Sequence, residues 1–538
     1  MKPVATFALA IGIAVLSCAS AQAQPRAVAE RDTAVVTTMG GNLDGVRLPS
    51  GVEAYLGIPY AAPPVRDLRW RPPEPAKPWD GTFHADRFGP QCPQPLRGIM
   101  TNQYSGAEVS SEDCLYLNVW GKPGLENAPV IVFIHGGGFF VGSGSMPLYS
   151  GEHLAERDVV AVNFNYRLGA LGFLAHPDLT AESPDGASGN YGFLDQVAAL
   201  EWVRDNIDRF GGDPDNVTIV GQSAGSMSVL ALEASPLAEG LFDRAVGMSG
   251  ALIGDLGPAA IRPLDDAEAD GVRIQDIWGA SSLEEMRSLA PDRLLDLPRT
   301  PGSPRLGPVR DGRFLTRSID NVFESGGQHD VPLVLGFTKD ESFGGFGPVS
   351  GLAEYEQRAQ ERFGVRADEF LRLYPASTDE EAMDQARQAS RDATMAMPML
   401  AWATQQHDHG ESPVFSYQFA RAHQYPDGLK IAGHDVASAG AYHTSEVPFW
   451  LGTLESFNLF RPTRAWSERD RELSDRLQDA LVTFAATGSP TTASLEWPRF
   501  DPADPHLLLL DIDDDIASWP SAAKFDFFRS IAEATSGH

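Results

Sequence analysis

Short apolar runs recur along the chain at lengths typical of buried strands, with amphipathic stretches between them. Residues 129–134 are continuously apolar, as strands buried on both faces of a sheet are, and residues 159–166 are interpreted as a second such strand. In residues 192–210 apolar side chains recur at three-residue steps, which predicts a helix that ends at Gly211-Gly212-Asp213-Pro214. The other expected strands are residues 51–57, 115–120, 217–220, 244–249, 331–336, 414–419 and 507–510, and a further helix is expected at 472–486. This alternation predicts a mostly parallel sheet with helices on both faces.

The strand expected at residues 217–220 ends in Gly221-Gln222-Ser223-Ala224-Gly225. A helix-compatible stretch follows at once, so the motif has the strand–turn–helix context of a nucleophile elbow. Glycines on both sides let the backbone pass close to its neighbours where a Cβ would clash. Ser223 is therefore predicted to be a nucleophile, with the N-terminus of the following helix directed at it.

Composition narrows the classes of function. The chain has 538 residues, 43% of them hydrophobic, and a formal net charge of −31. Such a charge disfavours binding to nucleic acid or to anionic lipid. We find no His-Glu-x-x-His and no clustered Cys/His spacing, so neither a metal nor another cofactor is expected.

The N-terminus has the pattern of an export signal. Lys2 supplies a positive charge, residues 4–16 are apolar, and small residues suitable for cleavage follow at 19–23. We therefore expect a signal peptide at residues 1–23, a single domain at 24–538, no transmembrane segment, and a secreted or periplasmic location. A buried N-terminal helix, or a lipid anchor at Cys18, is the alternative.

Two of the three cysteines, Cys92 and Cys114, remain in the mature chain. An even pair in an exported protein predicts a disulfide, which would stabilise the fold by about 3 kcal/mol in the chain-entropy model. Two free thiols are the alternative.

Several motifs in a fixed order give the chain a resemblance to the type-B carboxylesterases, which include cholinesterases and bacterial para-nitrobenzyl esterases. The resemblance covers nearly the whole mature chain. The motifs are residues 111–119, 135–139 (His-Gly-Gly-Gly-Phe), 165–169, 210–214, 221–225, 339–341 (Lys-Asp-Glu) and 441–443 (Ala-Tyr-His). The resemblance implies an α/β-hydrolase fold: a large, mostly parallel central sheet with helices on both faces and a small N-terminal antiparallel sheet.

The resemblance also implies roles for individual residues. Ser223 would be the nucleophile, His443 the general base and then acid, and Glu341 the acid that orients it, in the chain order of an α/β-hydrolase. Asp340 and His434 are the alternatives for the last two roles. The backbone N–H groups of Gly137, Gly138 and Ala224 would form the oxyanion hole. The polar residues Ser249 and Asp392 would support the acid.

Two departures from cholinesterases concern the substrate. Gln222 replaces the glutamate often found before the serine, and the expected disulfide loop contains Tyr104 where cholinesterases carry a tryptophan, which weakens the case for choline esters. Gln222, Tyr104 and Phe139 are the expected substrate-binding residues. We therefore expect a serine carboxylesterase that acts on a small-molecule ester. An acyltransferase or amidase with the same residues, or a non-catalytic binding protein, is the alternative; the sequence leaves the oligomeric state open.

Overall fold

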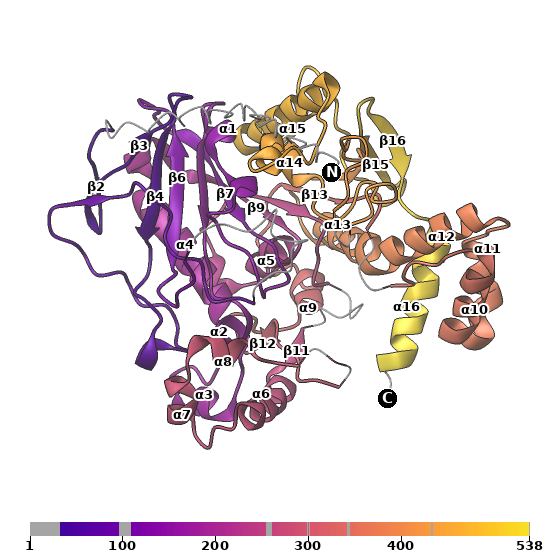
Figure 1. Cartoon of the computed structure of the whole chain (residues 1–538), viewed down its shortest axis with the longest axis horizontal. Helices are drawn as coiled ribbons and strands as arrows, with labels where there is room; N and C mark the ends of the chain where they lie inside the picture. The colour runs from indigo at the N-terminus through magenta and orange to yellow at the C-terminus, as the bar shows by residue number, and fades with distance from the viewer. Residues whose placement is uncertain are drawn as a thin grey trace, which may run out of the picture.

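The computed structural model describes residues 33–95, 109–253, 261–298, 300, 302–341, 345–431 and 434–536. Within these residues, eleven strands form one twisted central sheet (Figure 1). In spatial order the strands are β16 (Asp515–Ser518), β15 (His506–Leu510), β14 (Val414–Phe419), β13 (Leu333–Thr338), β10 (Arg244–Met248), β9 (Gly212–Gln222), β7 (Ala128–Ile134), β8 (Val160–Phe164), β6 (Tyr116–Gly121), β4 (Glu53–Pro59) and β3 (Val46–Arg47). The predicted signal peptide at residues 1–23 lies outside the described residues.

The seven strands from β15 to β8 pair in parallel, and only the flanking pairs are antiparallel. The central strands are buried on both faces. Val130 and Val132 of β7 pack into one core, and Ile131 and Phe133 into the other, as the alternation of side chains along a strand requires. The predicted α/β-hydrolase fold is confirmed.

A separate three-stranded sheet lies near the N-terminal end of the described chain, formed by β1 (Val36–Thr38), β2 (Gly41–Asp44) and β5 (Thr82–His84). β1 and β2 are antiparallel, as predicted, but β5 pairs with β2 in parallel. The prediction of a purely antiparallel small sheet is therefore wrong. The reason is the long connection from residue 45 to residue 81, which returns the chain to enter β5 in the direction of β2.

Helices cover both faces of the central sheet. The core that contains Val130 includes residues of α4 (Tyr191–Asn206), α5 (Ala224–Glu233) and α13 (Met397–His409). The core on the other face includes residues of α1 (Glu152–Ala155), α14 (Val447–Trp450) and α15 (Glu468–Thr487). The helix expected at residues 192–210 is α4 followed by a short 3-10 turn.

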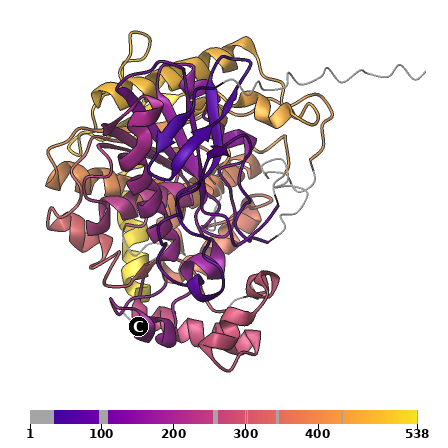
Figure 2. The ribbon, with the colours of Figure 1, turned by 90° about the vertical axis from the view of Figure 1, so that its left-hand side faces the viewer.

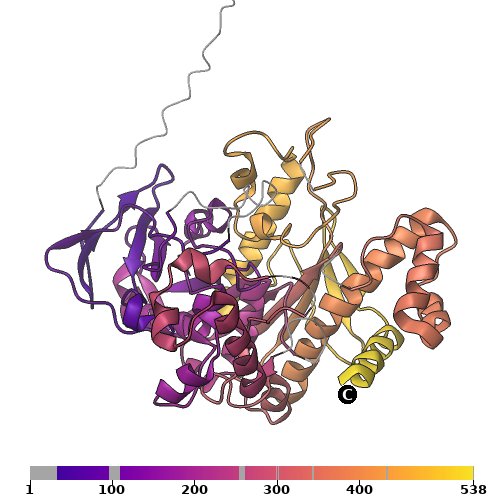
Figure 3. The ribbon, with the colours of Figure 1, turned by 60° about the horizontal axis from the view of Figure 1, so that its bottom comes forward.

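The other helices lie around these two layers, and several of them contribute side chains to the first core. Figure 2 shows the helices of residues 264–295 gathered at the lower end of the molecule, and Figure 3 shows those of residues 352–391 projecting from one side next to the C-terminal helix. These other helices are α2 (Gly169–Phe173), α3 (Pro177–Glu182), α6 (Leu264–Trp278), α7 (Leu283–Ser288), α8 (Pro291–Leu295), α9 (Ile319–Glu324), α10 (Leu352–Phe363), α11 (Ala367–Leu373), α12 (Asp379–Arg391) and α16 (Ala522–Ser536). Among the described helices, none has the length and apolar character needed to cross a bilayer.

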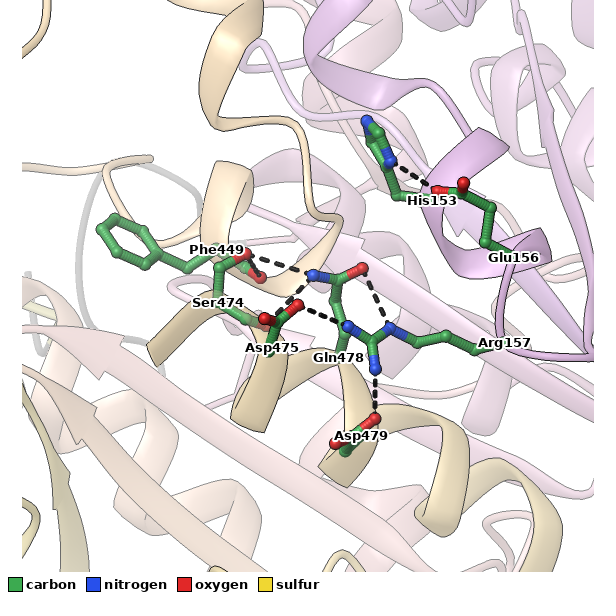
Figure 4. Close-up of polar contacts among 8 residues, drawn as sticks. All are labelled: His153, Glu156, Arg157, Phe449, Ser474, Asp475, Gln478 and Asp479. Atoms are coloured by element: carbon green, nitrogen blue, oxygen red, sulfur yellow. Dashed lines mark hydrogen bonds and ion pairs between the residues drawn. The ribbon is translucent and has the colours of Figure 1, made fainter. Parts of the chain in front are cut away.

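Polar contacts fasten α15 to its neighbours (Figure 4). Arg157, two residues after α1, pairs with Asp475 at 2.6 Å and also with Asp479, both on α15. Ser474 of α15 donates to the carbonyl oxygen of Phe449 in α14 at 2.9 Å. α14 begins four residues after His443, so these contacts fix one end of the segment that carries the predicted catalytic histidine.

Candidate active site

Ser223 lies between β9 and α5 in a backbone conformation that is strained for a residue with a side chain. Its φ is 58° and its ψ is −122°. Such a conformation persists only where the surroundings enforce it. A Cβ at Gly221 would lie 2.1 Å from the carbonyl oxygen of Gly225, and a Cβ at Gly225 would lie 2.0 Å from that of Ile134. The two glycines therefore let β7, β9 and α5 approach closely enough to hold Ser223 at the tip of the turn.

His443 and Glu341 are in direct contact. Nδ1 of His443 lies 2.7 Å from Oε2 of Glu341, although the two residues are 102 positions apart. Glu341 is fully buried, and its Oε1 accepts the backbone N–H of Thr338 at 3.3 Å. An ionised carboxylate can only accept, so Nδ1 of the imidazole carries the proton, and Nε2 keeps a lone pair. This is the tautomer that a general base for a serine requires.

The two alternatives that the sequence leaves open are engaged elsewhere. Asp340 accepts the backbone N–H of Ala441 through Oδ2 at 2.7 Å. Nε2 of His434 lies 2.7 Å from the hydroxyl of Tyr425, and burial lowers the pKa of His434 below its ordinary value. The contacts therefore favour Glu341 and His443 for the predicted roles.

Gln222, the residue before the serine, is buried against the histidine. Its Nε2 lies 3.2 Å from Nε2 of His443. The nitrogen of the imidazole that faces away from Glu341 thus has a neutral amide beside it, in the place where a glutamate would bring a negative charge.

The loop after β7 lies against the serine. A Cβ at Gly136 would lie 3.0 Å from Cβ of Ser223, and the next three residues all have positive φ: 115° at Gly137, 64° at Gly138 and 65° at Phe139. Ala224 is the first residue of α5 and is fully buried. Its backbone N–H belongs to the helix end that carries partial positive charge.

Phe139 packs among other aromatic rings. It is 5% exposed, and its ring centroid lies 5.0 Å from that of Phe173 and 5.6 Å from that of Phe193. The structure thus places the Phe139 ring in the core, and its role in substrate binding stays a prediction. The next residue, Phe140, lines a cavity of about 320 Å³, together with apolar residues that include Leu294, Leu297 and Leu306 and with the polar residues Thr300, Ser303 and Arg305.

The sequence analysis missed a second buried carboxyl group, that of Glu446. Its Oε2 accepts the hydroxyl of Tyr417 at 2.6 Å, and its Oε1 accepts the hydroxyl of Ser249 at 2.7 Å. The pKa of Glu446 is raised to about 7, mainly by burial; the two hydroxyl donors lower it and the nearby Glu341 raises it. Its place three residues after His443 is the one signal in the sequence that could have drawn attention to it.

Ser249 and Asp392 were expected to support the acid. Ser249 donates to Glu446, as described above. Asp392 is fully buried; its Oδ2 accepts the hydroxyl of Tyr374 at 2.9 Å and its Oδ1 accepts from Arg391 at 2.7 Å. Arg391 in turn donates to the carbonyl oxygen of Lys339 at 3.4 Å. Asp392 therefore reaches the segment around Glu341 through Arg391, and Ser249 reaches it through Glu446.

Cys92 and Cys114 form the expected disulfide, which closes a segment with a sequence separation of 22. Tyr104, the third expected substrate-binding residue, is within that segment and lies outside the described residues.

Comparison with known proteins identifies the family. The family model described as "Carboxylesterase family" matches residues 32–528. The chain belongs to the carboxylesterase family. Its curated relatives include a fumonisin B1 esterase from Sphingopyxis macrogoltabida, 37% identical over 86% of this chain and 84% of the relative. They also include a para-nitrobenzyl esterase from Bacillus subtilis (strain 168), 34% identical over 91% of this chain and 97% of the relative.

Solved structures agree with this assignment. A structure of a PNB esterase superimposes with a TM-score of 0.76 at 32% identity, and the match covers 91% of this chain and 98% of that one. A thermophilic PNB esterase also matches with a TM-score of 0.76, over 92% of this chain and 99% of that one. The resemblance to type-B carboxylesterases is confirmed, and this member of the carboxylesterase family is a serine carboxylic-ester hydrolase.

Proposed function

We propose that Ser223 is the nucleophile of this esterase, that His443 is its general base and then its general acid, and that Glu341 orients the histidine. The observation that carries the proposal is the 2.7 Å contact between Nδ1 of His443 and Oε2 of Glu341. It fixes the imidazole in the tautomer that can take a proton at Nε2. The strained turn at Ser223 supports the same assignment.

Each step of the reaction has a group to perform it. Oγ of Ser223 attacks the ester carbonyl carbon while its proton passes to Nε2 of His443, and the carbonyl oxygen becomes an oxyanion. The oxyanion collapses, the bond to the alcohol oxygen breaks, and His443 gives its proton to the departing alcohol. Water then attacks the acyl-enzyme with His443 again as base, which releases the carboxylic acid and restores the serine.

The oxyanion is proposed to bind the backbone N–H groups of Gly137, Gly138 and Ala224. The close approach of Gly136, where an added Cβ would lie 3.0 Å from Cβ of Ser223, supports the placement of this loop beside the nucleophile. A Cβ at Gly137 would lie 1.9 Å from the carbonyl oxygen of Val141, whereas one at Gly138 would meet nothing within 4 Å. Gly137 thus serves close packing of the loop, and Gly138 leaves open space where a substrate carbonyl could approach.

The proposed substrate is an uncharged ester with an apolar portion of moderate size. Gln222 provides a neutral amide beside His443, so the site lacks the carboxylate that would favour a cationic alcohol. The cavity of about 320 Å³ next to Phe140 is mostly apolar and could hold such a portion. The relatives named above, a fumonisin B1 esterase and a para-nitrobenzyl esterase, are consistent with an organic ester rather than a choline ester.

We also propose that the chain is exported, with cleavage of residues 1–23 and a single domain at 24–538. The disulfide between Cys92 and Cys114 supports an oxidising compartment, where such bonds persist. Mass spectrometry of the protein recovered from the periplasm or medium of an expressing bacterium tests this. An N-terminus beyond residue 18 supports export, and an intact N-terminus in the cytoplasm contradicts it.

The mechanism is tested with p-nitrophenyl esters of increasing acyl length and with three proteins: wild type, Ser223→Ala and Glu341→Gln. We expect Ser223→Ala to show no turnover above background and no labelling by a fluorophosphonate. Glu341→Gln should lose roughly 10³- to 10⁴-fold in kcat, because a neutral amide does not stabilise the imidazolium and its NH2 group can donate to Nδ1, which holds the imidazole in the wrong tautomer. Equal activity in wild type and Ser223→Ala would overturn the nucleophile assignment.

A further inference from the structure

Asp340, the residue before the proposed catalytic acid, makes two hydrogen bonds to one residue of the histidine loop. Its Oδ2 accepts the backbone N–H of Ala441 at 2.7 Å, and its own backbone N–H donates to the carbonyl oxygen of Ala441 at 3.0 Å. Ala441 is fully buried and lies two residues before His443. We call these two bonds the Asp340–Ala441 pair.

The pair joins the two segments whose register determines the contact between Glu341 and His443. Asp340 and Glu341 are adjacent, and Ala441 and His443 are two residues apart, so the segments are tied at two neighbouring points. Sliding one segment against the other would break the Asp340–Ala441 pair and lengthen the 2.7 Å contact between Nδ1 and Oε2 together. We infer that Asp340 is a positioning residue, which holds the histidine loop at the distance that lets Glu341 orient His443.

Gly440 shows how closely the loop approaches Asp340. Its φ is +56°, and a Cβ there would lie 2.2 Å from Oδ2, 2.5 Å from Cγ and 3.0 Å from Cβ of Asp340. A glycine is therefore required for the loop to reach the carboxylate, both for its backbone conformation and for space. Asp340 on one segment and Gly440-Ala441 on the other therefore form a single contact.

The carboxylate acts as an acceptor rather than through an ion pair. Nε of Arg387 is 4.0 Å from Oδ1, and the Arg387 side chain is 37% exposed. Exposed ion pairs of this kind contribute little to the stability of a protein. The part of Asp340 that matters is thus the oxygen that meets the N–H of Ala441, and an asparagine can supply the same oxygen.

Another aspartate in the chain provides a matched control. Asp330 accepts the backbone N–H of Glu411 at 2.8 Å and that of Ser412 at 3.1 Å. It lies before β13, whereas Asp340 lies after it, so the two aspartates make similar bonds at opposite ends of the same strand. The Asp330→Ala variant therefore measures how much stability the protein loses when a pair of such hydrogen bonds is removed away from the site.

The inference rests on the proposed roles of Ser223, Glu341 and His443, and the experiment separates the two. Wild type, Ser223→Ala, Asp340→Ala, Asp340→Asn and Asp330→Ala are compared for kcat, KM, the pH profile of kcat and the rate of fluorophosphonate labelling. We expect Asp340→Ala to lose about 10- to 100-fold in kcat with KM nearly unchanged, because a displacement of about 1 Å has an effect of this size. Asp340→Asn should stay within threefold of wild type.

The pH profile distinguishes positioning from a general loss of stability. When the contact with Glu341 is loosened, the imidazolium is less stabilised, so the acid limb of the kcat profile of Asp340→Ala should move to lower pH. Asp330→Ala should keep the wild-type profile and kcat even if its Tm falls. Gly440→Ala should resemble Asp340→Ala, and should cost less in the Asp340→Ala background, where the carboxylate is gone.

Three results would overturn the inference. They are an Asp340→Ala enzyme with the kcat and pH profile of wild type, an Asp340→Asn enzyme as impaired as Asp340→Ala, or Asp330→Ala with the same loss of kcat as Asp340→Ala. A wild type no more active than Ser223→Ala would instead contradict the proposed function, so the two failures are separate.

Discussion

The side-chain amide nitrogen of Gln222 lies 3.2 Å from Nε2 of His443, the nitrogen that is proposed to take the proton of Ser223. Since Nδ1 already donates to Glu341, Nε2 has a lone pair and the amide can donate to it. Gln222 therefore shares the face of the imidazole that the reaction uses. A charged side chain at position 222 would therefore act directly on the protonation of His443.

Replacing Gln222 by glutamate should change the pH dependence of the enzyme. A carboxylate a few ångströms from the ring stabilises the imidazolium, so the acid limb of the kcat/KM profile should move to higher pH by about one unit or more. The same charge should lower KM for a cationic ester relative to a neutral one of equal size. Both effects are measured with steady-state kinetics between pH 5 and 9.

Gln222→Met is the control for this change, because it keeps the length of the side chain without the charge. If the methionine variant shows the same displacement of the acid limb, shape rather than charge is responsible and the electrostatic argument fails.

The two glycines proposed for the oxyanion hole should respond differently to alanine. Gly137→Ala places a Cβ 1.9 Å from the carbonyl oxygen of Val141, so the loop must move and both stability and activity should fall. Gly138→Ala meets no atom within 4 Å, so its cost in stability should be limited to the strain of a positive φ, about 1–2 kcal/mol. Thermal unfolding and kcat of the two variants test this, and a Gly138→Ala protein less stable than Gly137→Ala would contradict it.

The central strands and the elbow could be predicted because they depend on local pattern. The apolar run at residues 129–134 is β7 in the structure, and the predicted strand at 217–220 forms the end of β9 directly before Ser223. The direction of β5 could not be predicted, because it depends on the path of the long connection before it and not on the three residues of the strand.

The contacts within the site could not be predicted in the same way, because they depend on tertiary structure. Asp340 and Glu341 are neighbours with the same chemistry, and only the fold determines that one faces Ala441 and the other faces His443. Glu446 is one acidic residue among 73 in the sequence. Its distinguishing property, burial beside Ser249, arises from a contact across 197 positions. For Phe139, the motif fixes its place in the loop but not the direction of its ring, which only the fold determines.

Glu446 should make the stability of the protein decrease as pH rises toward neutrality. Burial raises its pKa from 4.5 to about 7, so the folded protein binds this proton more tightly than the unfolded chain. Below pH 4.5 the group is protonated in both states, and above pH 7 it is ionised in both. Between these values the folded state loses its advantage, and the full change is about 3 kcal/mol.

The measurement is the free energy of unfolding in urea at several pH values for wild type and Glu446→Gln. The glutamine has no titrating proton, so the variant should gain stability relative to wild type as pH rises from 4.5 to 7, while the contributions of other groups cancel in the difference. Glu369→Gln is a control of opposite sign at lower pH: its hydrogen bond with Arg366 lowers the pKa of Glu369 below 4.5, so the variant should lose relative stability as pH rises toward 4.5 and change little above it. A difference between wild type and Glu446→Gln that stays constant with pH would show that the buried carboxyl is not linked to folding, because the proton would then be bound equally in the folded and unfolded states.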